Sequence, residues 1–107
     1  MQGTFLKFYV YEQRKHQREL LYEWLLQKAK QIGIQGGSAF RAIAGYGRHG
    51  VLHEQRFFEL SADLTVEVEF VVSEEQSEQL LEEIRREGIH IVYAKVPAEL
   101  GVIEGKD

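Results

Sequence analysis

The sequence predicts an α+β fold with the element order βαββαβ, in which two helices cover one face of a four-stranded antiparallel sheet. Two kinds of pattern carry this prediction. Some segments alternate apolar and polar residues, as half-buried strands do, and others repeat apolar residues at the spacing of an amphipathic helix. Because crossover connections are right-handed, both helices fall on one face and the strands take the spatial order four, one, three, two. This is the ferredoxin-like arrangement.

The first strand is expected over residues 4–12, where β-branched and aromatic residues favour an extended chain. Alternation assigns Leu6, Phe8 and Val10 to the face that meets the helices. The opposite face carries Phe5, Lys7, Tyr9 and Tyr11.

The first helix is expected over residues 17–32. One stripe along it carries Leu21, Leu25, Lys28 and Ile32. Gly33 is placed to end the helix, whereas no good N-cap residue fixes its start. The second strand is expected over residues 38–46, and residues 47–61 show no clean period and are expected to form a loop.

The third strand, expected over residues 62–72, has the clearest alternation in the chain. Its apolar set is Leu64, Val66, Val68, Phe70 and Val72, and its alternate positions are Thr65, Glu67, Glu69 and Val71. The apolar set is therefore assigned to the core.

The second helix has a start signal, because Ser73 is an N-cap residue and Gln76 completes a capping box. This helix runs to about residue 87, where Gly88 ends it, and it buries Leu80, Leu81 and Ile84. A fourth strand is expected over residues 89–96, stopped by Pro97, with residues 98–107 as a short tail. The chain is therefore expected to be a single domain over residues 1–107 with its core at about 4–97.

Composition excludes several classes of protein. With 13 basic and 17 acidic residues the net charge is −4, which argues against nucleic-acid binding. The chain has no cysteine, so disulfides and thiolate chemistry are excluded. No apolar run approaches the ~20 residues that span a bilayer, and no leader pattern opens the chain. We therefore expect a cytoplasmic protein with no insertion into a membrane.

The segment "GYGRHG", residues 45–50, matches the glycine fingerprint of dinucleotide-binding folds. That fingerprint needs a helix immediately after the glycines, whose N-terminus binds the pyrophosphate. The residues that follow have no helical stripe and lead into the third strand, so we reject this interpretation. Backbone amides beside glycines, next to Arg48 and His49, nevertheless suit an anion.

Several segments together resemble the PII signal-transduction proteins. They are the βαββαβ order, "GYGR" at the end of strand two and "VEVEFVV" as strand three. The segment "LYEWLLQKAKQIGIQGGSAFRAIAGYGRHG" is more closely similar to the PII-like family called domain of unknown function 190. This resemblance implies a homotrimer that senses adenine nucleotides in clefts between subunits. It also implies that the loop, residues 48–61, controls a partner protein, often a transporter.

The resemblance assigns ligand-binding positions to Gly37, Gly45, Gly47, Arg48 and His49. The chain also departs from PII proteins. It has "REGIH" where they carry a Gly-Asp-Gly-Lys loop before strand four, and "VPAELGVIEG" where they carry arginines after it. The resemblance therefore implies a small anionic effector, whether ADP, AMP, ATP or a cyclic nucleotide, and leaves a ligand with fewer phosphates or no nucleotide open.

Two alternatives to a nucleotide sensor remain. His49 and His53 are four residues apart, and the trimeric CutA proteins share this fold, so the chain could be a CutA-like metal-binding module. A trimer that only docks onto a partner is the other alternative. No Ser/His/Asp or Cys/His set appears, and the only aspartates are Asp63 and Asp107, so we do not expect an enzyme.

The sheet face opposite the helices predicts assembly. It carries the aromatics Phe5, Tyr9 and Tyr11, and strand two adds either Arg41 and Ile43 or their neighbours. Lys7 is expected to pair with Glu67 or Glu69 on the adjacent strand. Aromatics mixed with complementary charges suit a subunit interface better than open solvent.

Overall fold

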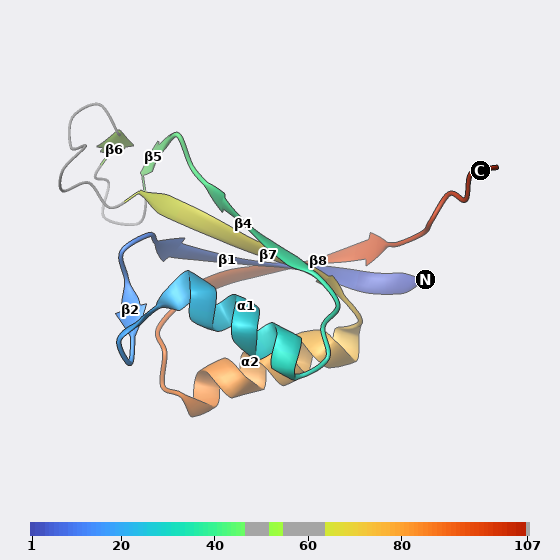
Figure 1. The fold of residues 1–107 in the computed structure, drawn as a ribbon, viewed down its shortest axis with the longest axis horizontal. Helices are drawn as coiled ribbons and strands as arrows, with labels where there is room; N and C mark the ends of the chain where they lie inside the picture. Colours follow the sequence, from blue (N-terminus) through green and yellow to red (C-terminus); the bar gives the residue numbers. More distant parts are fainter. Residues whose placement is uncertain (47–51, 55–63, 107) are drawn as a thin grey trace.

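The computed structural model describes residues 1–46, 52–54 and 64–106, and these form a two-layer α+β fold (Figure 1). Four strands make one antiparallel sheet in the order β4-β7-β1-β8. They are β1 (Gln2–Tyr11), β4 (Gly37–Arg41), β7 (Thr65–Val72) and β8 (Val92–Glu99). The helices α1 (Leu21–Gln31) and α2 (Glu74–Arg86) cover one face of the sheet. The predicted ferredoxin-like fold and strand order are confirmed.

The core lies between the sheet and the helices. Leu6, Phe8 and Val10 of β1 are buried, as is the whole apolar set assigned to the third strand. The rings of Phe8 and Phe70 meet edge to face, with centroids 6.2 Å apart. The helices contribute Leu21, Trp24, Leu25, Ala29, Leu80, Leu81 and Ile84. The alternation in both central strands therefore predicted the buried face correctly.

Helix α2 begins as its sequence predicts. The Ser73 hydroxyl accepts a hydrogen bond from the Gln76 amide at 3.0 Å, and the Gln76 side chain accepts one from the Ser73 amide at 3.2 Å. This reciprocal capping box satisfies two amide donors that a helix start leaves open. Gly88 follows the helix with φ +72°, a left-handed conformation that glycine adopts without strain.

Helix α1 begins later than residue 17, because a small hairpin precedes it. The hairpin pairs β2 (Lys15–His16) with β3 (Glu19–Leu20) through a turn at Gln17 and Arg18, which have φ 52° and 73°. The His16 imidazole lies 2.8 Å from a carboxylate oxygen of Glu87, which ties the hairpin to the end of α2. Two-residue strands are too short to show a period, so sequence patterns could not reveal them.

The second strand is divided, which corrects the single strand expected over residues 38–46. After β4 the chain bends at Ile43 and continues as β5 (Ala44–Tyr46), which pairs with β6 (Leu52–Glu54) in a separate antiparallel ladder. The Ala42 amide still donates to Thr65 O, at the first residue of β7, and the described pairing of β4 with β7 ends there. The loop expected over residues 47–61 therefore contains a short strand at residues 52–54.

The last strand begins and ends later than the residues 89–96 expected for it. Strand β8 runs through Pro97, which lies opposite Thr4 in the register with β1. Because β8 is an edge strand, the amide that proline lacks can face solvent without breaking the ladder. Beyond β8 the Leu100 amide donates to Met1 O at 2.8 Å, which joins the two ends of the domain.

Candidate functional site

The described part of the glycine segment lies on the β5–β6 hairpin. Gly45 pairs with His53 across that hairpin, the following Tyr46 is 75% exposed, and Ile43 at the bend before β5 is 88% exposed. A Cβ added to Gly45 would meet no atom within 4 Å. Packing of the described residues therefore does not require glycine here.

Gly37 has a different environment. It begins β4, and a Cβ added to it would lie 2.4 Å from Cε1 of the Phe70 ring. The absence of a side chain at Gly37 lets the edge strand pack directly against that ring. Gly37 and Gly45 are separated by the whole of β4, so the described part of one subunit does not bring them together.

The other predicted ligand-binding residues, Gly47, Arg48 and His49, lie outside the described residues, as do Phe57 and Phe58. Within residues 1–46, 52–54 and 64–106, no three His, Cys, Asp or Glu residues gather as a metal-ligand set. No helix in that part of the chain is long and apolar enough to cross a membrane.

An ion pair that sequence reasoning missed lies at the base of the β5–β6 hairpin. Arg41, the last residue of β4, donates from Nε to Glu12 Oε1 at 3.1 Å and from Nη2 to Glu12 Oε2. These hydrogen bonds raise the pKa of the Arg41 guanidinium above its ordinary value. Strands β1 and β4 run in the same direction, so the strand order alone places Glu12 and Arg41 at the same end of the sheet.

The sheet face turned away from the helices, called the outer face below, is rich in exposed apolar side chains. Register places Phe40 opposite Glu67, Val92 opposite Tyr9 and Val96 opposite Phe5. Strand two therefore contributes the neighbours of Arg41 to this face rather than Arg41 itself. The exposed apolar residues of the outer face are Tyr9, Tyr11, Phe40, Val71, Val92 and Val96.

The outer face also carries a small charged cluster. The Lys7 ammonium lies 4.0 Å from Glu69 Oε2, so of the two predicted partners Glu69 forms the pair. A hydrogen bond with Glu67, together with partial burial, raises the pKa of the Glu69 carboxyl. Partial burial and the Glu67 carboxylate likewise raise the pKa of Tyr9. The cluster therefore holds more negative charge than Lys7 alone neutralises.

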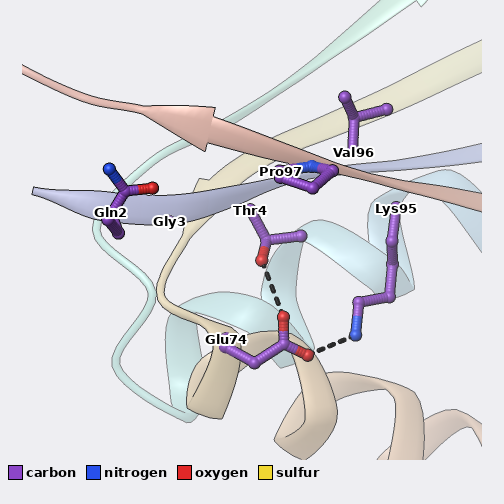
Figure 2. Close-up of a pocket in the computed structure, with 7 residues that line it drawn as sticks. All are labelled: Gln2, Gly3, Thr4, Glu74, Lys95, Val96 and Pro97. Carbon is purple, nitrogen blue, oxygen red and sulfur yellow. Dashed lines mark hydrogen bonds and ion pairs between the residues drawn. The ribbon is translucent and has the colours of Figure 1, made fainter.

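A pocket of about 290 Å³ lies beside the first residues of β1, at the end of the sheet opposite the β5–β6 hairpin. Figure 2 shows the residues that line it. Lys95 of β8 donates to both Glu74 and Glu78 of α2, the latter at 2.7 Å, and the buried Thr4 hydroxyl donates to Glu74 at 3.0 Å. The first residues of β1 and Pro97 complete its wall. These contacts join β8 and β1 to the start of α2, so we assign them a structural role.

The comparisons with known proteins agree with this architecture. The model of the family DUF190, described as uncharacterized ACR, matches residues 3–96. A UPF0166 protein of Aquifex aeolicus (strain VF5) is 36% identical over 80 residues, which are 75% of this chain and 76% of that protein. The UPF0166 protein MJ1524 of Methanocaldococcus jannaschii is 34% identical over 96 residues, 86% of this chain and 88% of that protein.

A solved structure shares the fold over nearly the whole chain. It is CPII of Thiomonas intermedia K12, a nitrogen regulatory PII-like protein bound to ADP, AMP and bicarbonate. The TM-score is 0.68 at 21% identity, covering 95% of this chain and 91% of CPII. The fold is thus PII-like, and the chain belongs to the DUF190 family, as the glycine segment and the element order predicted.

Proposed function

We propose that this chain is a PII-like regulatory protein that binds an adenine nucleotide in clefts between the subunits of a homotrimer. The observation that carries the proposal is the likeness to CPII, which is bound to ADP and AMP and shares the fold over 95% of this chain. The exposed outer face supports the assembly, and the space beside Gly45, where an added Cβ would meet no atom within 4 Å, supports a ligand at the hairpin.

The proposed mechanism needs no covalent chemistry. Gly45 and Gly47 give phosphate oxygens access to backbone amides, and Arg48 and His49 add charge-assisted hydrogen bonds. Gly37 would line the base of the cleft. Ligand binding then shifts the population of conformations of residues 48–61, and the shifted segment binds or releases a partner such as a transporter. We accordingly propose a cytoplasmic regulator rather than an enzyme.

Titration calorimetry of the full chain with AMP, ADP, ATP and cyclic nucleotides tests this proposal. Replacing Arg48 with Ala should weaken binding by about 1.5–3 kcal/mol, the usual value of a hydrogen bond to a charged group. The matched control is Arg85→Ala, because Arg85 is exposed on α2 and pairs only with Glu82 among the described residues. If no nucleotide binds the wild type at millimolar concentration and divalent metal salts raise its Tm instead, the CutA-like alternative replaces the proposal.

A further inference from the structure

The outer face carries two carboxyl groups side by side. Glu67 and Glu69 are two residues apart on β7, so both side chains leave the same face of the strand. Register places Lys7 opposite Glu69 and Tyr9 opposite Glu67, and the Tyr9 and Glu67 side chains are hydrogen-bonded. Glu67 and Glu69 are also hydrogen-bonded to each other. Two carboxyl groups can form such a bond only when one of them keeps its proton.

The charged side chains of the main sheet on this face are Lys7, Glu67 and Glu69. Strand β1 adds the phenols of Tyr9 and Tyr11. The positions of β4 and β8 that neighbour the cluster carry uncharged side chains, namely Ser38, Phe40, Val92, Ala94 and Val96. With both carboxyls ionised, the carboxylates exceed the single ammonium by one charge. With one proton shared between them, the charges of the face cancel.

We propose that this cluster links assembly to pH: the outer faces of neighbouring subunits bind each other most tightly when Glu67 and Glu69 share one proton. The inference rests on the homotrimer of the proposed function. Burial of an unpaired carboxylate costs much more free energy than burial of a hydrogen-bonded group without excess charge. Because assembly buries the outer face of every chain, it favours the form of the cluster that holds the proton.

The surroundings of the two carboxyls support this coupling. In the single chain the Lys7 and Glu69 side chains are already only 29% and 22% exposed. The hydrogen bond with Glu67, followed by partial burial, raises the pKa of the Glu69 carboxyl. The apolar side chains of Phe40 and Val71, on the same face, are half exposed. A second copy that covers these apolar groups also removes solvent from the carboxyls, and this raises their affinity for the proton further.

The direction of the pH effect follows from this difference between the free and the assembled chain. A carboxyl pKa that is higher in the assembled state favours assembly fully at pH values below the free-chain pKa. That contribution is lost as the pH rises through the assembled-state pKa. One proton bound per chain changes the association constant by at most about tenfold per pH unit for each chain, or roughly a thousandfold for a trimer.

Sedimentation equilibrium of the full chain between about pH 5 and pH 9, at fixed ionic strength, measures this linkage. The concentration needed for assembly should rise with pH in the wild type. Glu67→Gln keeps the Lys7–Glu69 pair, and its amide can donate to Glu69 as a protonated carboxyl does. This variant should therefore assemble in alkali as tightly as the wild type does in mild acid. The matched control is Glu82→Gln on α2, which removes a carboxylate that is 58% exposed and should keep the wild-type pH dependence.

Infrared spectroscopy detects the proton itself, even if the assembly is too tight to dissociate. The wild type should show the absorption of a protonated carboxyl at pH values above the ordinary glutamate pKa of about 4.3. Glu67→Gln should lose this absorption, because Glu69 then faces Lys7 alone and ionises, whereas Glu82→Gln should retain it. Thermal unfolding of each variant shows whether it has folded.

The outcomes separate the two proposals. A wild type that stays a single chain at every pH refutes the homotrimer of the proposed function. If the wild type assembles but shows no protonated carboxyl above the ordinary glutamate pKa, only the proton linkage is overturned. The same holds if Glu67→Gln keeps the full pH dependence of the wild type.

Discussion

Two buried hydroxyls near the start of α2 differ in their hydrogen bonds. Ser77 is fully buried, and its hydroxyl has no hydrogen-bond partner among the described residues. Thr4 is almost as buried, but its hydroxyl donates to Glu74 at 3.0 Å. An unpaired buried hydroxyl destabilises the folded state, whereas a paired one is close to neutral or favourable.

Ser77→Ala should therefore raise the free energy of unfolding by about 1 kcal/mol, since alanine also has the higher helix propensity. Thr4→Val should lower it by about 1 kcal/mol through loss of one hydrogen bond. Urea unfolding of both variants measures the difference. A clear loss of stability in Ser77→Ala would mean that the hydroxyl has a partner, such as a buried water.

The glycines Gly37 and Gly45 give a second pair of opposed predictions. Gly37→Ala should destabilise the domain by about 2 kcal/mol, because the new methyl group would overlap the Phe70 ring. Gly45→Ala should change stability by less than about 0.5 kcal/mol, because its Cβ would meet open space. Thermal unfolding of the two variants makes the comparison. Equal losses would show that Gly45 also has a packing role.

Residue types alone could not separate these glycines. Both belong to the segment that carries the family resemblance, so the resemblance assigned them one ligand-binding role. The two glycines differ in the atoms that an added Cβ would meet, and these atoms depend on strand register. Arg41 and Glu12 were missed for the same reason, because their partnership depends on the ends of two strands separated in the sheet by a third.

The elements differ in how well local patterns determine them. Strands β1 and β7 alternate over 8 or more residues, and α2 has a capping box, so their identities and buried faces follow from the sequence. The β2–β3 hairpin, the bend at Ile43 and the passage of β8 through Pro97 have no such signal. Each of these features depends on a neighbouring element. The hairpin contacts Glu87 through His16, and the pairing of β4 with β7 stops where β7 begins. Strand β8 can contain a proline because it lies at the edge of the sheet.

The contact between β8 and α2 gives a prediction about pH. Hydrogen bonds from Lys95 and Thr4 hold the pKa of Glu74 below its ordinary value. A lowered folded-state pKa means that the contact stabilises the protein above the ordinary glutamate pKa of about 4.3, and that this contribution is lost as the pH falls through the lowered value. Glu74 and Glu78 raise the pKa of Lys95, so the same contact persists through the ordinary lysine range and is lost only as the pH rises above it.

Lys95→Met should therefore have a lower free energy of unfolding than the wild type between about pH 5 and pH 10. This difference in the free energy of unfolding should disappear in acid. Chemical denaturation at several pH values measures it. Lys30→Met is the control, because Lys30 is exposed on α1 and forms no ion pair within the described ranges. A difference that stays constant down to the lowest pH would assign the effect to packing of the Lys95 stem rather than to its charge.

At the scale of the whole molecule, the outer face exposes apolar side chains, and the fold of a single chain does not explain this exposure. Its exposed apolar residues lie on all four strands of the main sheet, and they surround the cluster of Lys7, Glu67 and Glu69. So many exposed apolar side chains on one face mark an interaction site more often than free surface. Neither of the described helices covers it, because α1 and α2 both lie on the other face of the sheet (Figure 1). Further copies of the chain are the simplest cover.

We therefore predict a cyclic trimer of about 37 kDa, three chains of 12.4 kDa, that buries the outer face. Lys7→Glu should weaken assembly, because it replaces the cation 4.0 Å from Glu69 with a third carboxylate beside Glu67 and Glu69. The repulsion is screened by salt, so the loss should be larger at low ionic strength than at high. Lys30→Glu makes the same change of charge on the helix side and should leave the mass unaltered. Light scattering at micromolar concentration provides the measurement: a wild type that stays at 12.4 kDa would refute the trimer, together with every site proposed between its subunits.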